Sequence, residues 1–309
     1  MTKPLCNLII DSCCDLPADV VDREGVELLE FPYIMEDGEH SDDLYRTTDA
    51  HTFFQAMRDG SRPSTAQLSM PVLDAAFRRA AESGVPTVFL CFSSGLSGTY
   101  DTAVMTLEQV RAEYPDAEIY IVDTKLASVA EALLVYEALR QRERGLTASE
   151  LARWAEEARY FVDAEFMVDD LEALRRGGRI PGSIAYAGAK LDVKPLLTID
   201  PDGKLTLCGV ARGRKKGIKQ LVDYYLKRVA PASFGQHVVI GNADCPKDAE
   251  RLKELLSKAD ENILFLESSI GPVIGSHVGP GMIAVVFWGS DKREAVSVAD
   301  RIARKVKGA

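Results

Sequence analysis

The feature that most limits the fold of this chain is an apolar run that stops abruptly at small polar residues. Residues 87–92 read Thr-Val-Phe-Leu-Cys-Phe, and residues 93–100 read Ser-Ser-Gly-Leu-Ser-Gly-Thr-Tyr before a helical pattern over residues 100–110. A buried strand, a glycine turn and a helix in this order place hydroxyl and backbone N–H groups where they bind an anion. Residues 93–100 include no histidine, cysteine, lysine or acidic residue that could activate a serine, so we expect this segment to bind a ligand and not to catalyse a reaction.

Strand, polar turn and helix recur in this order through the first half of the chain. Apolar runs at residues 5–10, 87–92 and 118–122 each end at a serine or an aspartate. Such alternation predicts a parallel sheet covered by helices on both faces, with ligands bound at the C-terminal ends of the strands. We therefore expect a parallel α/β domain over residues 1–160 that carries the binding loops, with the loop at Thr65 able to reach them.

The pattern changes from about residue 161. Apolar runs at residues 194–199 and 204–210 flank the turn Asp-Pro-Asp-Gly, which is typical of a β-hairpin. Further strands are expected at residues 237–241, 263–267 and 281–288, with helices at 217–229, 247–258 and 292–306. The hairpin implies a mostly antiparallel sheet, so we expect a second, α+β domain over residues 161–309.

Composition excludes several classes of protein. The chain has 309 residues, 46% of them hydrophobic, and a net charge of −10, which disfavours a nucleic-acid or anionic-membrane surface. No apolar run is long enough to form an integral membrane segment, and the first residues lack an export signal. The six cysteines form no C-x-x-C pair, so we expect neither a disulfide framework nor a metal site, and the cytoplasm is the expected compartment.

The candidate ligand-binding residues of the first half are Thr65, Ser94, Ser97 and Gly98, all in loops expected at the C-terminal edge of the sheet. Hydroxyl and N–H groups bind a carboxylate through hydrogen bonds that contribute about 1.5–3 kcal/mol each. We therefore expect an uncharged polar site for an acid. The alternative is that these residues only cap helices.

Two candidates lie in the second half. His277 is embedded in glycines and prolines over residues 270–281, which predict a fixed, irregular backbone with access for a ligand. A structural histidine is the alternative. Arg212 opens a basic stretch over residues 212–216, which would suit an acid head or a phosphate; the alternative is a solvated turn.

Six motifs in order along nearly the whole chain resemble the DegV family. They are Asp-Ser-Cys-Cys-Asp-Leu-Pro at 11–17, Pro-Ser-Thr-Ala-Gln at 63–67, the segment at 93–100, Leu-Arg-Arg-Gly-Gly-Arg-Ile at 174–180, Val-Ala-Arg-Gly at 210–213, and Ile-Gly-Ser-His-Val-Gly-Pro-Gly at 274–281.

The resemblance implies a two-domain protein that holds one long-chain fatty acid between its domains. It implies a carrier, not an enzyme, which presents the acid to a fatty-acid kinase related to dihydroxyacetone kinases for phospholipid synthesis. On this resemblance Thr65 and Ser97 bind the carboxylate, His277 lies near the head group, and Arg212 serves kinase docking or phosphoryl transfer. The fatty acid is the ligand, and no cofactor is expected.

The chain departs from the family pattern at two places. Cys13 and Cys14 stand where the family usually has Thr-Ser, and we interpret them as small thiols in place of hydroxyls, because adjacent cysteines rarely pair. Ala127 and Ser128 stand where a Ser-Gly or Gly-rich helix start is common, which could reshape the tunnel.

Two other functions stay open. A stand-alone phosphotransferase could use Arg212 and His277, although the sequence has neither a Walker-type loop nor a dinucleotide fingerprint. The second open function is that of a lipid-sensing regulatory protein.

Overall fold

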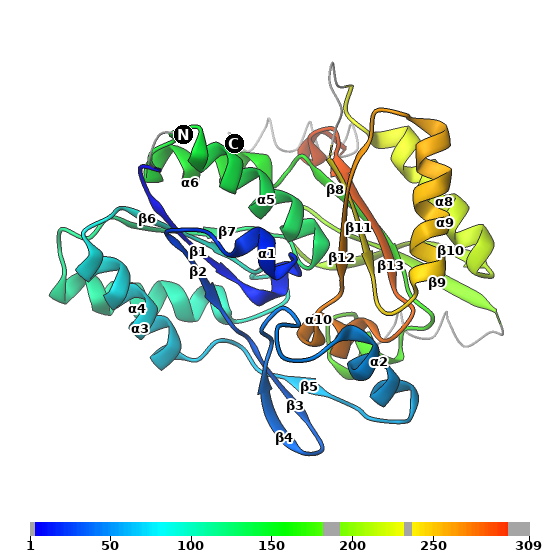
Figure 1. The fold of residues 1–309 in the computed structure, drawn as a ribbon, viewed down its shortest axis with the longest axis horizontal. Coiled ribbons are helices and arrows are strands. Elements are labelled where there is room, and N and C mark those ends of the chain that lie inside the picture. Colours follow the sequence, from blue (N-terminus) through cyan, green and yellow to red (C-terminus); the bar gives the residue numbers. More distant parts are fainter. Residues whose placement is uncertain (1–3, 182–191, 232–236, 296–309) are drawn as a thin grey trace, which may run out of the picture.

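The computed structural model describes residues 4–181, 192–231 and 237–295. Within them the chain forms three sheets, of four, six and three strands. Figure 1 shows the four-stranded and six-stranded sheets side by side, with helices between them and on their outer faces.

The four-stranded sheet is parallel, as the first half of the sequence predicts. Its order is β2-β1-β6-β7, built from β1 (Asn7–Asp11), β2 (Val26–Leu29), β6 (Thr87–Cys91) and β7 (Ile119–Asp123). α3 (Met70–Ser83) and α4 (Thr99–Glu113) cover one face, and α6 (Ala148–Ala158) covers the other (Figure 1). β6 is buried along its whole length, because helices cover it on both faces.

The six-stranded sheet is mixed and mostly antiparallel, which confirms the predicted texture of the second half. Its order is β10-β9-β8-β13-β11-β12, and only β11 and β12 are parallel neighbours. The strands are β8 (Val162–Met167), β9 (Val193–Ile199), β10 (Leu205–Arg212), β11 (His237–Asn242), β12 (Leu264–Ser269) and β13 (Ile283–Trp288). The expected hairpin joins β9 to β10. α8 (Arg214–Arg228) and α9 (Pro246–Ala259) cover its outer face (Figure 1).

The small third sheet begins where the chain leaves the four-stranded sheet. Residues 26–29 form β2 in that sheet, and β3 (Pro32–Met35) follows in the small one. Proline at the first position of β3 has no N–H to donate, and the start of a strand tolerates this loss. β4 (Gly38–Ser41) and β5 (Ser64–Thr65) pair with β3 on its two sides.

Shorter elements complete the described chain. They are a 3-10 turn (Ser12–Cys14), α1 (Ala18–Val21), α2 (Ala50–Arg58), α7 (Glu172–Arg176), α10 (Pro272–Val278) and a 3-10 turn (Lys292–Ala295). The rest of the helix expected over residues 292–306 lies outside the described residues.

α5 (Val129–Glu143) joins the two large sheets. Its sequence has apolar residues on nearly every side, which is typical of a buried helix, and ten of its fifteen residues are buried. It packs on β8, β11 and β13 of the second sheet and on the Ser12–Cys14 turn of the first half. The domain boundary between residues 160 and 161 stays a prediction, because α5 belongs to the first half by sequence but contacts both.

Candidate functional site

His277 lies on a helix, where the sequence suggested an irregular loop. α10 begins with Pro272 at its first position, which suits proline because the first N–H of a helix has no partner. It ends at Gly279, whose φ of +75° favours glycine. In its middle, a Cβ on Gly275 would lie 2.8 Å from rings of Phe53 and Phe54 on α2. Glycine therefore lets this helix of the second half pack closely on the first.

α10 brings His277 to Thr65. Thr65 is the last residue of β5, and its Oγ1 lies 2.8 Å from Nε2 of His277. Burial, and then the charges of Arg179 and Arg176, lower the pKa of His277 to about 4, so its ring is neutral at pH 7. Its other nitrogen, Nδ1, has no hydrogen-bond partner within the described part of the chain and packs against the backbone of Gly177.

The Thr65 and Ser97 loops are held together by hydrogen bonds between their neighbours. The side-chain Nε2 of Gln67 donates to Thr102 Oγ1 at 2.9 Å, and the backbone N–H of Leu68 donates to Thr99 Oγ1 at 3.2 Å. Gly98 makes this approach possible, because a Cβ there would lie 2.4 Å from the Gln67 side-chain oxygen. Gly98 is therefore a packing position in this structure and does not line the cavity described next.

Thr65, Ser97 and His277 line one cavity, which extends between the two large sheets. The remaining lining residues are mainly apolar and come from both halves of the chain: Cys13, Phe31, Ala66, Gln67, Phe92, Leu96, Ala127, Ser128, Val129, Ala130, Ala164, Phe166, Leu174, Arg179, Ile199, Leu205, Val273, Ile274, Val278, Met282, Ala284 and Val286. The cavity encloses about 770 Å³ of space without protein atoms, its opening included.

The polar residues mark the mouth of the cavity. Ala66 and Gln67, beside Thr65, are exposed, whereas Ala130, Ala284 and Val286 are buried. The arrangement is an elongated, mainly apolar space with hydrogen-bonding groups at its solvent end.

Arg179 is a further residue of the mouth, and it corrects the expectation of an uncharged site. It follows α7 in the basic glycine turn, lines the cavity, and its Nε donates to Leu96 O at 3.2 Å. Burial lowers the pKa of its guanidinium, with an opposing effect of Cys13, but arginine stays charged in proteins. The signal was present in the sequence, since Arg179 belongs to one of the family-like motifs.

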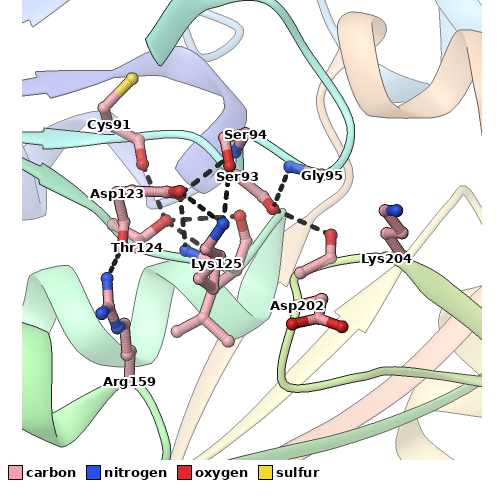
Figure 2. Close-up of polar contacts among 12 residues, drawn as sticks. Cys91, Ser93, Ser94, Gly95, Asp123, Thr124, Lys125, Arg159, Asp202 and Lys204 are labelled. Atoms are coloured by element: carbon pink, nitrogen blue, oxygen red, sulfur yellow. Dashed lines mark hydrogen bonds and ion pairs between the residues drawn. The ribbon is translucent and has the colours of Figure 1, made fainter. Parts of the chain in front are cut away.

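Ser94 does not line the cavity. Its hydroxyl accepts a hydrogen bond from Lys125 Nζ at 2.7 Å and its backbone N–H donates to Asp123 Oδ1 at 3.1 Å (Figure 2). Lys125 also forms an ion pair with Asp123 at 2.8 Å. These bonds between the β6–α4 and β7–α5 loops occupy the polar groups of Ser94.

Arg212 lies apart from the cavity, as the exposed last residue of β10. Its side chain has no hydrogen-bond or ion-pair partner among the described residues, whereas Arg214 is held by Asp169 and Asp248. Arg212 is therefore available to a partner molecule but not to a ligand at Thr65.

Three of the four residues that depart from the family pattern, Cys13, Ala127 and Ser128, line the cavity, and Cys14 does not. Cys13 and Cys14 are fully buried, and burial, followed by nearby carboxylates, raises the pKa of both thiols well above the usual value. Such thiols are poor nucleophiles. Ser128 has a φ of +55°, a backbone conformation that favours glycine, and its hydroxyl donates to Asp15 Oδ2 at 2.5 Å.

Two buried carboxyl groups lie where α10 begins. Asp15 Oδ1 accepts from Gly271 N at 2.9 Å, while Asp42 Oδ2 has no hydrogen-bond partner among residues 4–181, 192–231 and 237–295. Burial is the main cause that raises the pKa of Asp42, to about 7.

No cluster of histidine, cysteine or acidic residues suited to a metal ion occurs in the described part of the chain. Its helices are also too short or too polar to cross a bilayer.

Comparisons with known proteins agree with this fold. A family model described as "Uncharacterised protein, DegV family" matches residues 6–289. A DegV domain-containing protein of Clostridium perfringens is 35% identical over 285 residues, covering 92% of this chain and 98% of that protein.

Two solved structures share the architecture. A DegV lipid-binding protein from Thermotoga maritima is 27% identical with a TM-score of 0.80, covering 93% of this chain and 99% of its own. A fatty-acid-binding DegV family protein from Thermus thermophilus is 26% identical with a TM-score of 0.81, covering 92% and 99%. Because the family model spans nearly the whole chain, this chain belongs to the DegV family.

Proposed function

We propose that this protein binds one long-chain fatty acid in the cavity and presents its carboxylate at the mouth to a fatty-acid kinase. The observation that carries the proposal is an elongated, mainly apolar cavity that ends at Thr65, Ser97 and His277. The fatty-acid-binding relative from Thermus thermophilus, which has the same fold, supports it.

The hydrogen bonds at the mouth suit a carboxylate. A neutral His277 that donates from Nε2 to Thr65 Oγ1 leaves the threonine hydrogen free to donate to the ligand. Ser97 Oγ accepts from Thr99 N at 3.2 Å and lies 3.0 Å from Thr99 Oγ1. When Thr99 is the donor in that second contact, the hydrogen of Ser97 is available to the ligand. The charge of Arg179 adds attraction for an anion. Each such bond contributes about 1.5–3 kcal/mol.

The apolar part supplies most of the affinity. Burying an acyl chain of about fifteen methylenes at ~0.8 kcal/mol each stabilises the complex by roughly 12 kcal/mol before the costs of association. The head group therefore fixes the orientation of the ligand, and the tail retains it.

The role of the kinase partner rests on the family resemblance and on Arg212. Its exposed side chain, which has no partner among the described residues, can reach a partner protein or a phosphate, and Lys215 and Lys216 near it are exposed as well. We propose that Arg212 serves kinase docking or phosphoryl transfer. Cytoplasmic placement stays a prediction.

Native mass spectrometry of the protein purified from cells tests lipid binding. We expect one co-purified acid per chain, and after its removal palmitate should bind more tightly than hexadecanol, which has the same chain without the carboxylate. Absence of any bound acid, together with no binding of added palmitate, would refute the proposal.

The kinase step has its own test. Loaded protein, ATP and a dihydroxyacetone-kinase-like fatty-acid kinase should form acyl phosphate, and Arg212→Ala should slow this reaction without releasing the acid. ATP turnover by the chain alone would favour a stand-alone phosphotransferase. Acid binding without turnover by any such kinase would favour the lipid-sensing alternative.

A further inference from the structure

The strand β13 orders the cavity from its mouth to its deep end. Met282, Ala284 and Val286 line it, whereas Ile283, Val285 and Phe287 pack in the separate core under α8 and α9. This alternation shows that every second residue faces the cavity. Met282 lies nearest α10 in sequence, and Val286 lies four residues further on, about 13 Å along the strand.

The neighbouring strand β8 lines the cavity in the same order, from its mouth to its deep end. Ala284 pairs with Phe166 of β8, and Val286 pairs with Ala164, and all four residues line the cavity. The next pair on this face, Trp288 and Val162, does not line it. Ala164 and Val286 therefore mark the deepest described level of the cavity on this sheet.

A separate open groove begins beyond this level. Trp288 and Phe161 line it, together with Trp154, whose ring centroid lies 6.4 Å from that of Trp288. Trp288 is only two residues from Val286, or about 7 Å along the strand. The cavity and the groove thus lie on the same face of the sheet, separated by a thin layer of side chains.

The cavity and the groove follow each other in the same order along helix α5. Ala130 lines the cavity and Glu137 lines the groove, two helical turns later. Leu133 and Leu134 lie between them, are fully buried, and line neither space. We define the end wall as Leu133, Leu134, Val162 and Trp288, the residues that come next beyond the lining positions Ala130, Ala164 and Val286 on α5, β8 and β13.

We propose that this end wall sets the longest acyl chain that the protein accepts, and that the methyl end of the ligand meets Ala164 and Val286. The inference rests on the proposed fatty-acid binding and adds which residues select the ligand. Removing carbon atoms at this level should admit longer acids, and adding them should exclude acids that the natural protein holds.

The experiment measures affinities of delipidated protein for laurate, palmitate, stearate, arachidate and behenate. Val286→Ala removes two methyl groups, which makes room for about two methylenes, so the affinity for the acid two carbons longer than the preferred one should rise about tenfold relative to the preferred acid. Ala164→Leu should shift the preference to shorter acids. Thermal unfolding of each variant reports whether it is folded.

Val285→Ala is the matched control. It removes the same two methyl groups from the same strand, but its side chain faces the core under α8 and α9, so the chain-length preference should not move. The inference would be overturned if Val286→Ala and Val285→Ala had the same chain-length preference. It would also be overturned if Ala164→Leu still preferred the longest acid that the natural protein prefers. Neither result would contradict fatty-acid binding itself. Failure of the natural protein to bind any of the acids would overturn both.

Discussion

Replacing Thr65 by valine tests the division of labour between the head and the tail of the ligand. Valine keeps the shape of threonine but removes Oγ1, which lies 2.8 Å from His277 Nε2. The substitution leaves the apolar lining in place. It therefore removes one hydrogen bond to the carboxylate and also leaves the histidine nitrogen without its partner.

The size of the effect follows from these contacts. A hydrogen bond to an ionised group contributes about 1.5–3 kcal/mol, which corresponds to a rise in Kd of roughly 10- to 150-fold. The buried tail contributes roughly 12 kcal/mol before association costs, so the acid should still be retained during purification. We expect formation of acyl phosphate by a partner kinase to fall more than retention of the acid, because the carboxylate is no longer oriented.

The assay compares palmitate with hexadecanol by displacement of a fluorescent fatty acid. Thr65→Val should weaken palmitate binding and leave hexadecanol binding nearly unchanged. Thr206→Val is the control, because Thr206 is exposed on β10 and does not line the cavity. Equal weakening of both ligands would show that Thr65 acts on the fold or the tail, and unchanged palmitate affinity would place the carboxylate elsewhere.

Three further outcomes are expected. Burial raises the pKa of Asp42 to about 7, so the native state loses stability as the pH rises from about 4 to 7, where the unfolded chain ionises this carboxyl before the folded one does. Asp42→Asn should therefore stabilise the fold by at most about 4 kcal/mol at pH 8 and by less than half of that at pH 5, which thermal unfolding at the two pH values measures. Gly275→Ala places a Cβ 2.8 Å from buried phenylalanine rings and should cost about 1–3 kcal/mol in denaturant unfolding, whereas Gly209→Ala, with its nearest atom at 3.8 Å, should be nearly neutral. Arg179→Gln should weaken palmitate binding about tenfold and reduce its dependence on salt; an unchanged salt dependence would contradict a charged mouth.

Local patterns predicted the regular elements well where one physical signal dominated. α3 shows two such signals, because proline stands in its first turn and Gly84, in the left-handed region, follows its last residue. The hairpin of β9 and β10 follows from its Asp-Pro-Asp-Gly turn. These signals act over a few residues and need no partner from elsewhere in the chain.

Local patterns failed where a distant partner decides the conformation. Glycines and prolines around His277 suggested an irregular backbone, yet the packing of Gly275 against Phe53 and Phe54 keeps those residues helical. Ser94 and Ser97 are equivalent hydroxyls in sequence. In the folded protein, Lys125, which is paired with Asp123, donates a hydrogen bond to Ser94. Ser94 is therefore part of the loop contacts, whereas Ser97 lines the cavity.

The sequence by itself determined the parallel α/β half, the mostly antiparallel second half and the family, because hydrophobic periodicity, turn chemistry and motif order are local properties. It also named Thr65, Ser97 and His277. Only the tertiary structure decided that these three line one cavity, that Arg179 joins them, and where that cavity ends. A cavity is the space left between elements far apart in the chain, and its shape depends on how α5, α10 and the two large sheets pack together.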